Sequence, residues 1–121
     1  MRLEIRVAEP IEDMSARSRE HARRIDAGET PEPLCEVGFE TMAQFGAVFT
    51  PKRWELVEAL KAASPLSIYA LSKQLKRHYR NVHKDVTALI EWMVIEKDES
   101  GKVFVPWDEI AVRWPLIRQA A

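Results

Sequence analysis

The segment from residue 49 to residue 93 contains three helical patterns with almost no chain between them, and this limits the possible folds more than any other feature. Thr50 and Pro51 are residue types that begin a helix, and Pro65 ends it. Ser67 can then cap a second helix of about nine residues. This order, a helix followed by a short helix and then a longer one, is the basis of the predicted fold.

Each of the three helices has one apolar face. Phe49 and Trp54 have the spacing of a hydrophobic staple at the start of the first helix, and Leu66 and Leu71 have it at the start of the second. In the third helix, predicted over residues 79–93, apolar residues recur at the 3.6-residue period: Val82, Val86, Leu89, Ile90 and Met93. The uncovered side of this third helix is polar.

Beyond Met93 the period changes from helical to alternating. Two short apolar runs flank "DESG", with Gly101 near the end of the loop, which predicts a β-hairpin. Helix, short helix, tight turn, longer helix and hairpin is the order of a winged helix-turn-helix. We therefore predict an α+β fold, mainly α with a small β component, in which residues 47–121 form a winged helix-turn-helix domain. The final "AVRWPLIRQAA" can be a last strand or a short tail, with Trp114 a candidate partner contact.

Residues 1–46 read as a strand-helix extension. Leu3, Ile5 and Val7 alternate with charged residues, which predicts a strand, and residues 10–27 predict a helix with a thin apolar side. Gly28 stands where a left-handed cap would end that helix, and "LCEVGFE" weakly indicates a second strand. Because an isolated strand must pair, we expect this extension to mediate dimerisation. A chain starting near Ala47 should then be monomeric.

Charge is divided unevenly along the chain. The net charge is −1, but residues 1–50 hold six Lys or Arg against ten Asp or Glu, whereas residues 51–121 hold twelve against nine. From Lys73 to Lys84 there is no acidic residue. A basic segment on a helical pattern, followed by a hairpin, favours binding to a polyanion.

The third helix is the predicted DNA-reading element. In a helix-turn-helix the second helix of the motif enters the major groove, where long polar side chains reach base edges. The candidates for base contacts are Tyr79, Arg80, Asn81 and Lys84. The candidates for phosphate contacts are Ser67 at a helix N-terminus, Lys73, Lys76 and Arg77, and Lys102 at the tip of the hairpin.

Other classes of function find little support. The chain has no glycine-rich phosphate loop, HExxH motif or nucleophile elbow, so we expect no enzyme. Cys35 is the only cysteine, and His78 and His83 are too far apart for one helical face, so we expect no metal or cofactor. No stretch resembles a signal peptide or a membrane span, and we expect a cytoplasmic protein with no membrane partner.

Three stretches carry a resemblance to known proteins: "FTPKRWELVEAL", "PLSIYALSKQL" and "YRNVHKDVTALIEWMVIEKDESGKVFVPWDEI". The residues that are most specific to this resemblance are Tyr79, Asn81, Val82, His83, Asp85 and Val86. Residues 49–110 thus resemble prokaryotic winged helix-turn-helix regulators, broadly MarR- or ArsR-like and in part antitoxin-like. The resemblance implies a dimeric repressor that binds operator DNA. That family commonly has Gly and Asp where this chain has Lys76 and His78, a departure that bears on the turn, the helix cap and the operator preference.

The predicted function is therefore a sequence-specific regulator, a dimeric repressor on double-stranded DNA, with two rivals. In the first, the chain is an antitoxin whose N-terminal half neutralises a toxin protein and whose second half autoregulates the operon. The acidic residues that would face a basic toxin are Glu9, Glu12, Asp13 and Glu20. In the second, the chain is a protein-interaction module that keeps the winged fold without binding DNA.

Overall fold

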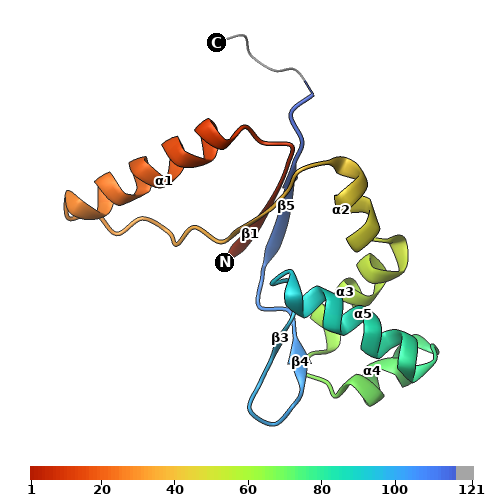
Figure 1. The fold of residues 1–121 in the computed structure, drawn as a ribbon. Coiled ribbons are helices and arrows are strands. Elements are labelled where there is room, and N and C mark those ends of the chain that lie inside the picture. The colour runs from red at the N-terminus through yellow and green to blue at the C-terminus, as the bar shows by residue number, and fades with distance from the viewer. Residues whose placement is uncertain (117–121) are drawn as a thin grey trace.

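The computed structural model describes residues 1–116 as an α+β fold with five helices, a three-stranded parallel sheet and a small hairpin (Figure 1). The elements are β1 (Arg2–Val7), α1 (Ile11–Asp26), β2 (Glu36–Phe39), α2 (Met42–Val48), α3 (Pro51–Ala63), α4 (Ile68–Leu75), α5 (Tyr79–Glu91), β3 (Glu96–Lys97), β4 (Val103–Phe104) and β5 (Glu109–Arg113). Within the described residues, no helix is long and apolar enough to cross a membrane.

The helix starts expected from the sequence are confirmed. The Thr50 hydroxyl accepts a hydrogen bond from the Arg53 backbone N–H at 3.3 Å, and the Ser67 hydroxyl accepts one from the Ala70 N–H at 3.0 Å. Both bonds satisfy donors that a helix leaves unpaired in its first turn. Short polar residues therefore fix where α3 and α4 begin.

The first strand finds its partners within its own chain, so it is not the isolated strand on which the expected dimerisation through residues 1–46 was based. Strand β1 lies at the centre of the sheet, between β2 and β5, and both pairs are parallel. Its register places Leu3 opposite Ile110 and Ile5 opposite Val112. The C-terminal segment thus contributes a last strand as far as Arg113, while residues 117–121 lie outside the described part.

One core joins the two halves of the chain. Leu3 and Ile5 of β1 are fully buried in the same cluster as Leu56 of α3 and Leu89 of α5. The predicted division between residues 46 and 47 therefore cuts through a continuous sheet and a continuous core. Residues 1–7 act as an integral part of the packing that supports the helices, because a buried strand cannot be removed without opening that core.

Helix α1 differs from the other long helices because it has no buried residue. It extends away from the helical layer, beside the sheet (Figure 1). Arg17 ties it to the sheet region through bidentate bonds to Glu9 and Glu36, at 2.6 to 2.9 Å. Hydrogen bonds from Arg17 lower the pKa of Glu36 below its ordinary value. Ion pairs, and little apolar packing, hold α1 in place.

Candidate nucleic-acid interface

The turn between α4 and α5 is a short connection of three residues, 76–78. Helix α4 ends at Leu75, and the residue that follows it, Lys76, adopts the left-handed conformation with φ 55°. His78 then begins α5, and its Nδ1 accepts a hydrogen bond from the Arg80 N–H at 3.2 Å. Lys76 and His78 thus give this connection a left-handed turn and a side-chain cap.

Helix α5 has an apolar inner face and a polar outer face. Val82, Val86 and Leu89 are fully buried, and they recur at helical spacing. The residues predicted to read bases are all exposed: Tyr79, Arg80, Asn81 and Lys84. Arg80 and Lys84 are four residues apart and so lie on one face of the helix. The outer face near the helix N-terminus therefore offers several hydrogen-bond donors to a partner.

Asp85 fixes α5 to the two segments before it. Its Oδ1 accepts a hydrogen bond from Arg53 Nε of α3 at 3.0 Å, and its Oδ2 accepts one from Arg77 Nη2 of the turn at 2.6 Å. Burial raises the pKa of Asp85, but these two hydrogen bonds outweigh burial, so the pKa lies below its ordinary value. The carboxylate is thus ionised and acts as a clamp that joins α3, the α4–α5 turn and α5.

Arg77 is one of the two arginines in this clamp. The sequence suggested a phosphate contact, but the structure places its guanidinium on Asp85 and leaves the side chain only 20% exposed. Arg77 therefore holds the turn to α5 through this ion pair. The other predicted residues are exposed: Ser67, Lys73, Lys76, Tyr79, Arg80, Asn81, Lys84 and Lys102. Within the described residues, no Lys or Arg side chain of that exposed group forms an ion pair. Lys73 lies over the ring of Tyr69, with Nζ 5.2 Å from the centroid.

The hairpin tip is ordered by Asp98. Its carboxylate accepts hydrogen bonds from the Ser100 N–H at 2.9 Å, the Ser100 hydroxyl at 2.7 Å and the Lys102 N–H at 3.0 Å. The bond from the Ser100 side chain is the main reason why the pKa of Asp98 lies below its ordinary value. Lys102 is exposed beside this carboxylate, so the tip has less positive character than the α4–α5 turn.

Sequence reasoning singled out His83 through the resemblance but missed Thr87, and both are exposed on the outer face of α5. His83 and Thr87 follow Arg80 and Lys84 on that face, and the His83 ring lies 5.9 Å from the ring of Tyr79. A helical wheel over residues 79–91 contains the signal for Thr87, which lies on the polar side, whereas His83 lies at the border of the buried face. Among residues 1–116, no three His, Cys, Asp or Glu side chains group as metal ligands.

Comparison with known proteins gives one match. The model of the HVO_A0114 family matches residues 48–112, which is more than half of the chain and includes α3, α4, α5, the hairpin and most of β5. Neither a curated protein nor a solved structure matches the chain. By this match, the chain belongs to the HVO_A0114 family.

Proposed function

We propose that this protein is a transcriptional regulator that binds double-stranded DNA through a winged helix-turn-helix formed by α3, α4, α5 and the β3–β4 hairpin. Helix α5 enters the major groove and presents its N-terminal turn to base edges. The hairpin is the wing. The protein acts as a repressor and binds as two copies on a palindromic site, because one such domain contacts too few base pairs for useful specificity.

The observation that carries the proposal is the exposed face at the start of α5. Arg80, Asn81 and Lys84 are exposed there, and Asp85, the one acidic residue in positions 79–90, is paired with two arginines. The face therefore has an uncompensated positive charge, together with side chains able to form paired hydrogen bonds to guanine and adenine. Asp85 also restricts how α5 can move relative to α3, and base readout requires such a fixed helix.

The residues divide by the part of DNA that they contact. Arg80 and Asn81 read bases, with Tyr79 and Lys84 beside them. Lys73 and Lys76 hold phosphates, and Ser67 can donate its hydroxyl hydrogen to a phosphate because its oxygen already accepts from Ala70. Lys102 adds a weaker phosphate contact from the wing. Arg77 supports the turn from within.

The test is selection of duplexes from a random library by the purified protein at physiological salt, followed by affinity measurements on the recovered site. Asn81→Ala should lower discrimination between that site and random DNA by about 1–3 kcal/mol. Lys73→Ala should weaken binding to both DNAs equally and reduce the salt dependence by about one ion. Arg19→Ala, which removes an exposed charge from α1, is the control and should change neither. An unenriched library would contradict the proposal and favour an interaction module.

An antitoxin is the second candidate, and the exposed apolar side of α1 favours it. Ile11, Met14 and Ile25 are 71%, 44% and 53% exposed. Two of the acidic residues expected to face a toxin already form ion pairs within the chain, however: Glu9 pairs with Arg17 and Glu20 pairs with Arg23. Co-expression with the product of a neighbouring gene tests this candidate. Ile25→Asp should abolish co-purification of that product and leave operator affinity unchanged.

A further inference from the structure

Strand β5 is an edge strand with an unused side. Among the described residues it pairs only with β1, so the backbone groups on its other side have no strand partner. The apolar residues at every second position become progressively more exposed along the chain. Ile110 is half-buried, whereas Val112, Trp114 and Leu116 are 43%, 47% and 76% exposed. An edge of this kind is a template for another strand.

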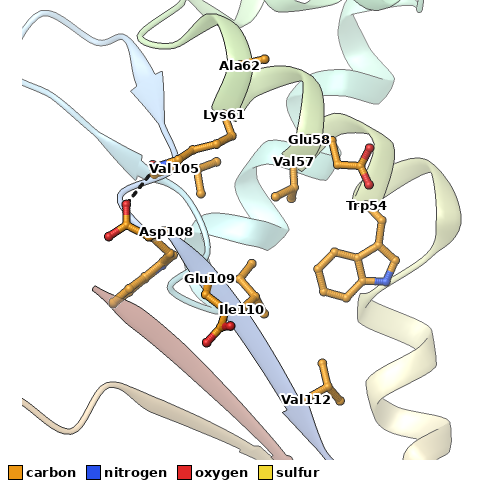
Figure 2. A pocket seen from close by; sticks show the side chains of 11 residues that line it. Trp54, Val57, Glu58, Lys61, Ala62, Val105, Asp108, Glu109, Ile110 and Val112 are labelled. Atoms are coloured by element: carbon orange, nitrogen blue, oxygen red, sulfur yellow. Dashed lines mark hydrogen bonds and ion pairs between the residues drawn. The ribbon is translucent and has the colours of Figure 1, made fainter.

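A groove lies beside that edge. It has a volume of about 610 Å³, and its apolar lining comes from Trp54 and Val57 of α3 on one side and Ile110 and Val112 of β5 on the other. Figure 2 shows the Trp54 ring and the Val112 side chain on opposite walls, with open space between them. The inner face of the sheet therefore continues past β5 as an apolar surface that no described residue of this chain covers.

The sequence of β5 indicates what covers it. Residues 109–113 read "EIAVR", and this stretch is complementary to itself when two copies run antiparallel about Ala111. In that register Glu109 of each copy lies opposite Arg113 of the other, and Ile110 lies opposite Val112. Opposite charges and apolar side chains are both favourable as directly opposed pairs. The small Ala111 falls on the two-fold axis, opposite its own copy.

We propose that two copies of this chain pair through β5 in this antiparallel register and form a continuous six-stranded sheet. Ile110 and Val112 of each copy then extend the apolar inner face into the groove below α3 of the other. The inference deepens the dimeric part of the proposed function and gives it a surface. It replaces the N-terminal strand, which is already paired on both sides, as the dimerisation element.

The charged residues of β5 are available for such pairing. Arg113 lies 3.7 Å from Glu4, and Arg2 lies 3.6 Å from Glu109, distances longer than those of a strong charge-assisted bond. The Glu109 and Arg113 side chains are 63% and 55% exposed. Exposed pairs of this length contribute little, so both side chains can turn to a partner strand at small cost.

The experiment is a charge-exchange test by analytical ultracentrifugation of the full chain without DNA. Glu109→Arg places two arginines opposite each other at both ends of the paired strands, and Arg113→Glu does the same with two glutamates. Each single variant should raise the dimer dissociation constant about tenfold or more. An equimolar mixture of the two should restore dimers, because every opposed pair is then Arg with Glu. The double variant should also dimerise like the unaltered protein.

Matched controls separate this surface from α1. Glu12→Arg and Arg19→Glu make the same charge changes on exposed positions of α1 and should leave the dimer unaffected. Three results would overturn the inference: a monomeric unaltered chain at about 100 µM, single variants that remain dimeric, or a mixture that stays monomeric. Circular dichroism confirms that each variant is folded. Binding to an isolated half-site is measured separately, so a failed dimer and a failed DNA interface are distinguishable.

Discussion

Replacing Asp85 by Asn tests whether one carboxylate fixes α5, the helix that we propose reads DNA. The carboxylate accepts from Arg53 and from Arg77, and all three side chains are at most 20% exposed. Asn has the same shape but no charge. Its amide oxygen can accept from one arginine, while its NH₂ group must face the other guanidinium, which has no acceptor. One charge-assisted bond is therefore lost and one cation is left without its counter-charge.

The expected loss follows from these two effects. A hydrogen bond to a charged group contributes about 1.5–3 kcal/mol, and an unpaired partly buried charge adds a desolvation cost. Partial exposure lets water reach Arg77 and reduces both. We expect Asp85→Asn to lower the free energy of unfolding by about 2–4 kcal/mol, a large fraction of the total stability of a small domain. Urea denaturation followed by tryptophan fluorescence measures this, with Glu91→Gln, at an exposed position of α5, as the control.

The effect of Asp85 also depends on pH in a defined direction. Its pKa is lower in the folded protein than in the unfolded chain, so its stabilisation is fully present above the ordinary value of about 4 and is lost as pH falls through the folded value. The difference between the unaltered protein and Asp85→Asn should therefore be constant between pH 5 and 7 and shrink below about pH 4. A difference of less than about 0.5 kcal/mol at pH 7 would refute the clamp, because solvent would then screen both ion pairs.

Three further substitutions test other parts of the structure, each by chemical denaturation. Lys76→Gly should raise the unfolding free energy by about 1 kcal/mol, because glycine adopts the left-handed conformation without strain; a decrease would show that the lysine side chain stabilises the turn. His78→Ala should lower it by about 1 kcal/mol by removing the cap on the Arg80 N–H, and an unchanged value would mean that water replaces the cap. Leu3→Ala should cost about 2–4 kcal/mol in a single transition, whereas Ile25→Ala on the exposed side of α1 should cost under about 0.5 kcal/mol; two separate transitions would favour an independent domain over residues 1–46.

Local signals in the sequence were sufficient for most of the helical layer, although α5 ends at Glu91 and Met93, expected on its apolar face, is 46% exposed. Thr50 and Ser67 cap the helices that follow them, and the rings of Phe49 and Trp54 stack with centroids 4.7 Å apart, as the staple spacing predicted. The hairpin forms around Gly101, whose φ of 86° suits glycine. Each of these features depends on residues within a few positions of one another, which is the range over which side-chain type and spacing determine backbone structure.

Longer-range features were not accessible in the same way. The alternation of Leu3, Ile5 and Val7 predicts a strand, but it does not identify a partner more than a hundred residues away. Parallel strands are joined by long connections, so no tight turn marks the pair in the sequence. The role of Arg77 depends on the position of Asp85, nearly two turns into α5, and on Arg53 of another helix. Its residue type alone fits a phosphate contact and a structural ion pair equally well.

The connection between the hairpin and β5 links the two proposed surfaces. Only residues 105–108 separate β4 from β5. Hydrogen bonds hold this connection to α3 and to the residues just after α5. The indole N–H of Trp107 donates to the Met93 carbonyl just after α5 at 2.8 Å, and Lys61 of α3 donates to the Val105 carbonyl at 3.2 Å. A dimer formed through β5 would therefore hold its two α5 helices at a fixed separation, since no flexible linker lies between them. Operators selected by such a dimer should share one half-site spacing, whereas a dimer held by α1, which has no buried residue, would permit several.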